Sequence, residues 1–389
     1  MMKPLKIAIY SGDIPSTTFI ERLIRGLSQH KHVVHLFGFK KKTVTYQGAV
    51  RVHAYRNRRV FKMAYLVKYL LLLTLFKFKD KKKLDTILKK DNRYTLQNLV
   101  KYYPVIWHHP DVFHLQWAKG INDWVWVKAF DMKLVVSLRG AHINYSPIAD
   151  QALAATYRAC FPKVDAFHAV SKAIAKEAEK YGADKEKITV IYSGLNLIAP
   201  KANNVSNNKY CLHIISIGRP HWKKGYVYAL DACRLLNRRH LNYQYKIIGG
   251  AHDIELAYQI NDLNLSNQVS LMDQLPFSEV KKAIQQADVL LLPSVEEGIA
   301  NVVLEALALK TLVLSTNCGG MAEVINDGVN GCLVPIRDPE AIADKILDIQ
   351  NMSEERKQEM IDLGHQTVLE QHNESQLIEN MQALYQSLF

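Results

Sequence analysis

Two glutamates are spaced so that both could contact one ligand. Glu297 and Glu305 lie eight residues apart, after an apolar segment at 289–292 that is predicted to be a buried strand. If a helix begins after Gly298, Glu297 lies at its mouth and Glu305 about two turns further along. Carboxylates placed in this way can accept hydrogen bonds from sugar hydroxyls. The competing interpretation is that acidic side chains gather near helix starts because the helix dipole favours them there.

The same turn is predicted to form an anion site. The first backbone N–H groups of a helix have no partner inside the helix, and they carry partial positive charge. Such groups bind phosphate well. The residues expected to hold a diphosphate in this way are Gly298, Ile299, Ala300 and Asn301.

A second charged group follows another predicted strand, at 212–217. Gly218 and Arg219 end this strand, and Lys224 comes directly before the next predicted helix. An arginine and a lysine five residues apart could both reach one diphosphate and neutralise the charge on it as it leaves. Lys223 is expected to point into solvent. Basic residues near a helix start are also common in the absence of any ligand.

Short apolar segments alternate with helical patterns along almost the whole chain, which predicts an α/β fold with parallel, doubly wound sheets. Strands are predicted at 6–10, 33–39, 112–115, 133–137, 166–170, 189–192, 212–217, 245–248, 269–272, 289–292 and 312–315. Ligands of such sheets bind at the carboxyl ends of the strands. Both charged groups lie at such ends.

An Asn-rich polar segment at 199–209 interrupts the alternation and is predicted to be a linker. It separates an amino-terminal Rossmann-like domain at 1–198 from a carboxy-terminal one at 210–370. A helix at 371–389 is expected to pack back on the amino-terminal domain. A chain of 389 residues is long enough for two domains with separate cores, and ligands are expected in the cleft between them.

The order of the motifs in the second half resembles the donor domain of the retaining glycosyltransferases of family four, which have the GT-B fold. The resemblance continues after Glu305 through Gly319-Gly320-x-x-Glu323 and Asp327-Gly328-x-Asn330-Gly331. It implies that Glu297 contacts the transferred sugar and Glu305 the nucleotide ribose. It further implies that Arg219 and Lys224 contact the donor diphosphate and that Gly249 lets the backbone approach the nucleotide. Glu296 has the wrong spacing and is expected to be a solvated turn residue.

The first half resembles the acceptor domain of that family only in outline. Gly12 lies in a segment, 10–16, where the family has a flexible loop that closes on both substrates. His114 and Trp117 lie near the end of another predicted strand, where they could line an acceptor groove. Arg139 and His142 stand where many members have His-Gly-x-Asp, so the resemblance places both near the reacting sugar. The arginine departs from that pattern, and His142 could equally be a loop histidine.

The resemblance implies a retaining transferase, of the hexosyltransferase type, that moves a sugar from a UDP- or GDP-linked donor to a lipid-linked or polysaccharide acceptor in cell-surface polysaccharide synthesis. No further cofactor is expected. No metal is expected either, because Asp-x-Asp and His-Glu-x-x-His are absent and the adjacent His108 and His109 cannot share one helical face. The absence of Gly-x-Gly-x-x-Gly argues against a dinucleotide dehydrogenase.

Charge and hydropathy suggest where the protein works. Residues 1–100 contain 22 Lys and Arg against 5 Asp and Glu, a balance of +17, whereas the rest carries −4. In an apolar segment with internal lysines, 60–78, the longest unbroken apolar run is 69–76 if Thr74 is allowed, which is well short of the roughly 20 residues needed to span a bilayer. The segment is therefore expected to be either a helix lying on an anionic membrane or a buried helix. Five scattered cysteines and the lack of a secretory signal suit the cytoplasm, with peripheral binding to the inner face of the membrane.

Two rival functions stay open on charge alone. A basic first quarter would also suit a non-catalytic protein that binds nucleic acid or another anionic polymer. A GT-B epimerase or phosphorylase is a lesser alternative. The glutamate pair together with Arg219 and Lys224 favours the transferase, because a polymer-binding protein has no use for that set, and nucleic acid is therefore not expected as a partner.

Overall fold

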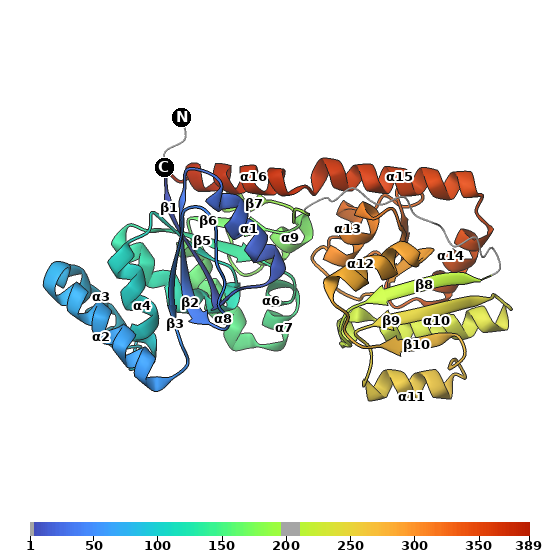
Figure 1. Cartoon of the computed structure of the whole chain (residues 1–389), viewed down its shortest axis with the longest axis horizontal. Coiled ribbons are helices and arrows are strands. Elements are labelled where there is room, and N and C mark those ends of the chain that lie inside the picture. Colours follow the sequence, from blue (N-terminus) through green and yellow to red (C-terminus); the bar gives the residue numbers. More distant parts are fainter. Residues whose placement is uncertain (1–3, 196–210) are drawn as a thin grey trace. The chain divides into compact units, whose positions relative to one another are not determined.

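A computed structural model describes residues 4–195 and 211–389 as two α/β units (Figure 1). The first unit comprises the chain up to Val170, Ile174–Tyr192 and Glu374–Phe389, and the second comprises Ser171–Ala173 and Ser193–Asn373. The predicted linker at 199–209 lies outside the described residues. The predicted fold class, two doubly wound parallel sheets with helices, is confirmed.

The first unit contains a seven-stranded parallel sheet with the order β3-β2-β1-β4-β5-β6-β7. Its central strands are buried on both faces, which explains their nearly continuous apolar sequences. The strands are β1 (Lys6–Ile14), β2 (Val33–Lys40), β3 (Val50–Tyr55), β4 (Val112–Leu115), β5 (Lys133–Leu138), β6 (Ala166–Ala169) and β7 (Ile188–Val190).

Helices connect and cover these strands. They are α1 (Thr18–Ser28), α2 (Arg59–Phe76), α3 (Phe78–Lys90), α4 (Leu96–His108), α5 (Ile121–Trp124), α6 (Ala141–Asn144), α7 (Ser146–Ala149), α8 (Gln151–Cys160), α9 (Lys172–Glu179) and the last helix of the chain, α16 (Glu374–Gln386). Helix α16 lies beside α1 (Figure 1), where the Ile378 side chain fills the space over Gly26.

The second unit contains a six-stranded parallel sheet with the order β10-β9-β8-β11-β12-β13. Its strands are β8 (Leu212–Ile217), β9 (Tyr243–Ile248), β10 (Val269–Met272), β11 (Val289–Leu292), β12 (Leu312–Thr316) and β13 (Cys332–Val334). Its helices are α10 (Tyr226–Arg238), α11 (Ile254–Asp262), α12 (Phe277–Gln286), α13 (Asn301–Ala308), α14 (Pro339–Asn351) and α15 (Glu354–Gln371).

Strand order reverses once in each sheet, between β1 and β4 in the first unit and between β8 and β11 in the second. At such a switch point the connections leave the sheet in opposite directions, so a crevice opens outside the carboxyl ends of the two strands. The crevice of each sheet is therefore the place where its ligand is expected to bind.

The structure differs from the sequence predictions in three strands. The expected loop at 10–16 is wrong up to Ile14, because β1 continues to that residue, with a bulge after Tyr10, and pairs with β2 as far as Lys40. Strands β3 and β13 were not predicted. Strand β3 is a partly exposed edge strand with Arg51 and His53 among its residues, so it lacks a continuous apolar run.

Most of the apolar segment at 60–78 forms helix α2, which has one buried and one exposed surface. Leu66, Tyr69 and Leu73 are buried at helical spacing, and the helix packs on α4 through this stripe. Tyr65 and Leu72 are half-buried beside this stripe. Nine large apolar side chains in and just after the helix are exposed, namely Val60, Phe61, Met63, Val67, Leu70, Leu71, Leu75, Phe76 and Phe78. Among the described residues, no helix is both long enough and apolar enough to cross a membrane.

Candidate functional site

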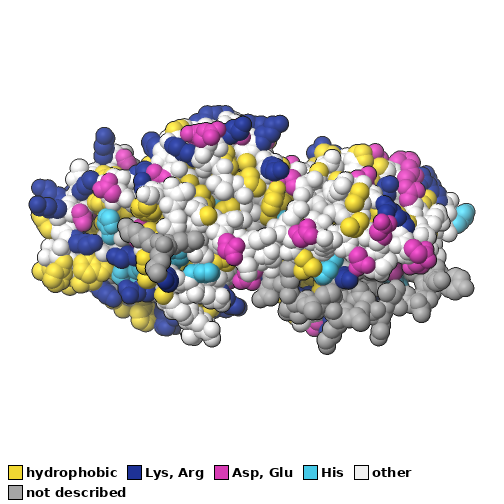
Figure 2. Space-filling view, turned by 90° about the horizontal axis from the view of Figure 1, so that it is seen from above, with side chains coloured by type: hydrophobic (Ala, Val, Ile, Leu, Met, Phe, Trp, Pro, Cys, Tyr) yellow, Lys and Arg dark blue, Asp and Glu magenta, His cyan; other side chains and the backbone are white. Residues whose placement is uncertain are grey.

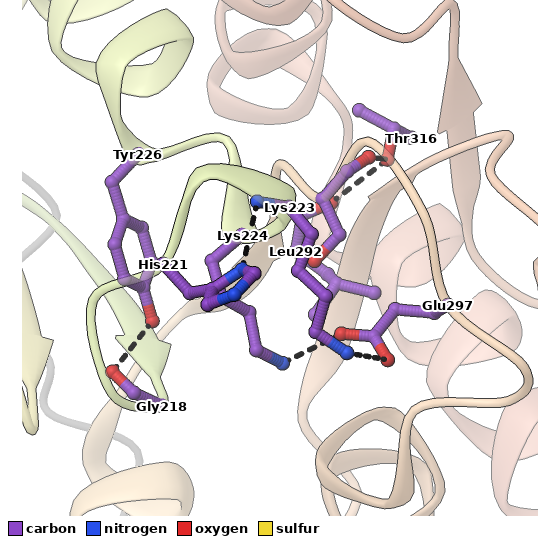
Figure 3. Close-up of polar contacts among 9 residues, drawn as sticks. Gly218, His221, Lys223, Lys224, Tyr226, Leu292, Glu297 and Thr316 are labelled. Carbon is purple, nitrogen blue, oxygen red and sulfur yellow. Dashed lines mark hydrogen bonds and ion pairs between the residues drawn. The ribbon is translucent and has the colours of Figure 1, made fainter. Parts of the chain in front are cut away.

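In the second unit, two residues from separate sequence motifs lie in contact. Lys224 Nζ lies 2.7 Å from Glu297 Oε1, and Lys223 Nζ lies 3.5 Å from Glu297 Oε2 (Figure 3). The Glu297 side chain is only 11% exposed. The expectation that Lys223 points into solvent is therefore wrong, because both lysines pair with this one carboxylate.

Backbone contacts bring the lysine turn and the glutamate turn together. The Val295 N–H donates to the Lys223 carbonyl at 2.7 Å. Gly225 has φ +63°, and a Cβ at this position would lie 2.0 Å from the Pro293 carbonyl oxygen, so no other residue fits here without movement of the backbone. Thr316, at the end of β12, donates to the carbonyls of Leu292 and Ser294 and holds the start of the glutamate turn (Figure 3).

The Gly-Gly motif has a packing role beside the glutamate turn. A Cβ on Gly319 would lie 1.7 Å from the Glu297 carbonyl oxygen, and a Cβ on Gly320 would lie 2.2 Å from that of Gly298. The Gly320 N–H donates to the same Gly298 carbonyl at 2.8 Å. Glu296, expected to be solvated, is half-buried with its carboxylate close to Gly319. Close backbone approach therefore explains why the turn needs both glycines.

The predicted anion site lies at the start of α13. Helix α13 begins at Asn301, and Ala300 caps it without a side-chain hydrogen bond to the first turn. Gly298 and Ile299 precede the cap. The N-terminal end of the helix dipole therefore lies beside the turn that carries Glu297. Glu305 is half-buried within α13.

A cluster of cations surrounds the end of β8. Arg219 is exposed and forms no ion pair with any described residue. Burial and the charges of Lys223, Arg219 and Lys224 lower the pKa of His221, which shows that this region is electropositive. Tyr226 donates to the Gly218 carbonyl at 3.0 Å and so fixes the strand end (Figure 3), and Gly249, after β9, packs against the same carbonyl.

Two further residues of the family motifs act within the fold. Glu323 accepts hydrogen bonds from the N–H groups of Lys172 and Ala173, the first two residues of α9, which are assigned to the second unit although the rest of α9 is assigned to the first. Asn330 is buried, accepts from the Asn326 N–H at 2.7 Å and donates to the Val324 carbonyl at 3.0 Å. The Asn330 side chain thus holds a turn of the second unit together.

In the first unit, a polar cluster lies at the carboxyl ends of β4 and β5. Arg139 Nη2 donates to Gln116 Oε1 at 3.2 Å, and its guanidinium lies over the Phe19 ring, 4.5 Å from the centroid. Burial lowers the pKa of Arg139 to about 10, so it stays charged at neutral pH. The Trp117 and His142 rings lie 5.2 Å apart, and burial lowers the pKa of His142.

This cluster leaves buried polar atoms without partners among the described residues. They are Arg139 Nε, His142 Nδ1 and Gln116 Nε2. Arg139 also forms no ion pair with a described carboxylate. Buried polar groups are nearly always hydrogen-bonded, so unpaired atoms at a ligand-binding sheet edge point to a ligand. No role was predicted for Gln116 from the sequence, although its place between His114 and Trp117 at a strand end was an available signal.

His114 does not line a groove, contrary to expectation. It is fully buried, with Nδ1 2.7 Å from the Tyr385 hydroxyl and Nε2 2.8 Å from Ser137 Oγ. Burial holds the pKa of His114 well below its usual range. In a fully buried strand its side chain must point into the core, where it links β4 to α16. Gly12, by contrast, has φ +90° and open space beside it.

A basic cavity of about 610 Å³ lies at the ends of β2 and β3. Its lining residues are Lys40, Lys41, Lys42, Thr43, Arg56, Asn57, Arg58 and Phe61. Of these cations, Lys41 pairs with Asp13 at 2.7 Å. The cavity adjoins the first turn of α2, because Arg58 and Phe61 belong to both. The charge count of the first hundred residues was the only sequence signal for it.

Among the described residues, one group has metal-ligating side chains close enough to hold an ion. It consists of His35, His53 and His108, in the first unit. The donor-side residues Glu297 and Glu305 do not belong to it. This group was not predicted, because its members are far apart in the chain and form no local metal-binding motif.

Two family models together match most of the chain. Residues 201–365 match the model "Glycosyl transferases group 1", and residues 16–199 match "Glycosyltransferase Family 4". A putative colanic acid biosynthesis glycosyltransferase, WcaL, of Salmonella typhimurium is 28% identical over 60% of this chain and 59% of its own length. The amylovoran biosynthesis glycosyltransferase AmsK of Erwinia amylovora is 30% identical over 56% and 55%. The chain thus spans less than two thirds of these relatives.

Solved structures share the fold at low identity. Anabaena HepE, determined in complex with UDP and glucose, has a TM-score of 0.70 at 16% identity and covers 97% of this chain and 98% of its own. The sucrose-phosphate synthase of Thermosynechococcus elongatus has a TM-score of 0.72 at 17% identity, with 99% coverage of both chains.

Proposed function

Since the chain belongs to the family-four glycosyltransferases with the GT-B fold, we propose that it transfers a sugar, with retention of configuration, from a nucleotide-sugar to a lipid-linked or polysaccharide acceptor. The observation that carries this proposal is the Lys224–Glu297 pair at the crevice between β8 and β11. There a carboxylate, a cluster of cations and a helix N-terminus are available to one ligand.

Donor binding would reorganise that pair. The donor diphosphate, held by Arg219, Lys223 and Lys224 and by the N-terminus of α13, would compete with Glu297 for the lysines. The released carboxylate could then accept hydrogen bonds from the hydroxyls of the transferred sugar. Glu305, inside α13, is proposed to accept from the ribose. HepE, which has the same fold, was determined with UDP-glucose; for this chain we propose a UDP- or GDP-linked hexose.

The proposed chemistry needs no enzyme nucleophile. The bond from the anomeric carbon to the diphosphate oxygen breaks, and the sugar passes through an oxocarbenium-like state. The acceptor oxygen then bonds to the anomeric carbon on the face that the diphosphate is leaving, and its proton passes to the diphosphate. Arg219, Lys223 and Lys224 would stabilise the departing charge, so no metal is proposed for the transfer step. Purified product of inverted configuration, observed by NMR, would refute this mechanism.

The acceptor is proposed to carry negative charge. Arg139 is a half-buried residue that forms no ion pair with a described carboxylate, and its Nε is buried without a partner. A charge with a buried donor is costly unless an anion or a polar ligand pairs with it. Arg139, His142, Gln116 and Trp117 are proposed to bind the acceptor beside the reacting sugar.

We also propose that the first unit binds the inner face of an anionic membrane. The exposed apolar side chains of α2 and the cations of the adjoining basic cavity form one surface, and Figure 2 shows apolar side chains beside Lys and Arg over the end of this unit where α2 and α3 lie. Shallow apolar insertion combined with attraction to anionic lipid suits an enzyme whose acceptor is anchored in the bilayer.

A thermal-shift screen against nucleotide-sugars tests the function directly. A donor that binds only the folded protein raises its melting temperature with concentration. We expect a shift with one UDP- or GDP-sugar that is lost in Glu305→Ala. If no nucleotide-sugar shifted the wild type while RNA or another polyanion did, the alternative function, binding of an anionic polymer, would be supported instead.

A further inference from the structure

Three histidines meet between the edge of the first sheet and the helices that cover it. His35 and His53 lie on the adjacent parallel strands β2 and β3 and point to the same face. His108 is the last residue of α4. The nitrogen atoms that these rings offer all lie within 4.8 Å of one another, and His35 Nδ1 lies 2.9 Å from His53 Nε2.

The spacing is close to that of a metal site. Zinc bonds to imidazole nitrogen at about 2.0–2.1 Å, so tetrahedral geometry separates two ligand atoms by about 3.3 Å. The rings therefore need to move by only about 1 Å. His35 is buried, whereas His53 and His108 are half-buried. Tyr69 Oη lies 3.2 Å from His108 Nε2, in the position of an outer-shell group that orients a ligand ring.

One nitrogen of the cluster is left for a ligand. His35 Nδ1 lies within hydrogen-bond distance of His53 Nε2, whereas His35 Nε2 is buried without a hydrogen-bond partner among the described residues. Buried polar atoms are nearly always hydrogen-bonded, so an unpaired ring nitrogen in this cluster suits a bound ion.

We propose that His35, His53 and His108 bind one divalent transition metal, with Zn²⁺ as the reference ion. Three imidazoles without a carboxylate favour Zn²⁺, Co²⁺, Ni²⁺ or Cu²⁺ over Mg²⁺, Ca²⁺ or Mn²⁺. The metal would join β2 and β3, at the edge of the first sheet, to α4, which packs on α2. The positive charges of Arg51 and Lys68 lie near the cluster and weaken its affinity for a metal ion.

The site is separate from the transfer chemistry proposed above, for which no metal is required. Its role is structural: it would hold the edge strands whose carboxyl ends form the basic cavity. The competing arrangement is a metal-free cluster in which the His35–His53 hydrogen bond and the stacking of His53 on His108, with ring centroids 3.8 Å apart, suffice on their own.

The test uses the full chain, made without a histidine tag and stripped with EDTA. Calorimetric titration with Zn²⁺ should give one site per chain, and Co²⁺ should give the strong visible absorption of tetrahedral coordination. His53→Gln and His108→Gln should each weaken Zn²⁺ binding at least tenfold. His109→Asn is the matched control, because it removes a neighbouring histidine at φ +47°, where asparagine is well tolerated, and it should bind as the wild type does.

Two results would overturn the proposal. One is the absence of saturable Zn²⁺ binding by the wild type, or a Co²⁺ spectrum that stays octahedral. Both are measured on the wild type, so they do not depend on whether a variant folds. The other is unchanged affinity in both His53→Gln and His108→Gln when circular dichroism shows that they are folded. Either result would assign the three rings to the metal-free cluster.

Discussion

Lys224 Nζ lies 2.7 Å from Glu297 Oε1, although 73 positions separate the two residues in the chain. Both side chains are largely buried, at 17% and 11% exposure. In the absence of a ligand, the lysine and the glutamate hold each other in place. We propose that a bound donor would contact the lysine through its diphosphate and the glutamate through its sugar. Breaking the pair by a single substitution is therefore expected to affect both the proposed diphosphate contact and the orientation of Glu297.

Lys224→Ala and Arg219→Ala should mainly lower kcat. The reason is that negative charge grows on the leaving diphosphate in the transition state, and removing one such donor typically costs a factor of about 10²–10³. Steady-state kinetics with the donor found by thermal shift measures this effect. Lys246→Ala, an exposed lysine on β9, is the control and should be fully active. Wild-type kcat in both site variants would refute the donor assignment.

The two glutamates should respond differently to substitution. Glu297→Ala should lower kcat about as much as loss of Lys224 does, since the transferred sugar loses its carboxylate partner. Glu305→Ala should chiefly raise the KM for the donor, because the proposed ribose contact is made equally in the ground state and the transition state. Full kinetic curves for both variants separate the two effects. An unchanged KM in Glu305→Ala would remove the ribose role.

Gly320→Ala should destabilise the second unit and abolish donor binding. Its Cβ would lie 2.2 Å from the Gly298 carbonyl oxygen, and overpacking of this kind costs about 1–3 kcal/mol. Urea unfolding and the donor thermal shift measure the two consequences. In Gly120→Ala the new methyl group would meet only ordinary contacts, 3.6 Å from Leu115, so that variant should behave as the wild type.

Membrane binding should require both the apolar and the basic part of the first unit. We expect sedimentation with anionic but not neutral liposomes, weakened by salt, since each Lys or Arg near the leaflet contributes about 1 kcal/mol. Among the lysines in the first half of α3, Lys81 pairs with Asp85 and Lys83 donates to the Ala129 carbonyl, whereas Lys79 and Lys82 are exposed and form no ion pair with a described residue. Lys79→Gln with Lys82→Gln should therefore weaken binding while leaving the donor thermal shift intact.

The apolar contribution has its own matched pair of variants. Leu75→Ser combined with Phe76→Ser removes two side chains that are 72% and 71% exposed on α2, and it should weaken liposome binding strongly. Ile254→Ser, at an 82% exposed position of the second unit, should leave it unchanged. Equal binding of the wild type to neutral vesicles, or none to anionic ones at low salt, would exclude this membrane surface.

Acid should destabilise the first unit through its buried histidines. In the folded chain the pKa values of His35 and His108 are about 4 and that of His53 is about 3, each below the ordinary value of 6.5. Between about pH 6.5 and 3, the unfolded chain therefore binds more protons than the folded chain does. The stability that the neutral histidines contribute is complete above pH 6.5, and the free energy of unfolding decreases as the pH falls below that value. Urea midpoints measured in EDTA between pH 7 and 5 should show this loss of stability, and His53→Gln should show a smaller loss. If the midpoints of the wild type and of His53→Gln changed equally with pH, the loss would not come from His53.

The sequence by itself determined the elements and their order. Apolar runs such as Val289–Leu292 and Val112–Leu115 are buried on both faces of a parallel sheet, so their composition alone marks them as strands. Gly218 and Arg219 directly after the strand 212–217, and the acidic turn a few residues after 289–292, marked the sheet ends that carry the candidate site. The edge strand β3 escaped prediction because a half-exposed strand mixes charged and apolar residues.

Tertiary structure decided which of the predicted residues meet, because side-chain direction and long-range pairing are not encoded in local spacing. His114 and Trp117 are three residues apart, yet one is locked in the core beneath Tyr385 and the other lies at the sheet edge next to His142. Lys223 is adjacent to Lys224 and, instead of pointing into solvent, approaches the same carboxylate. His35, His53 and His108 come together only because β2 and β3 pair in one register and α4 ends beside them, since that pairing brings residues from distant positions to one face of the sheet.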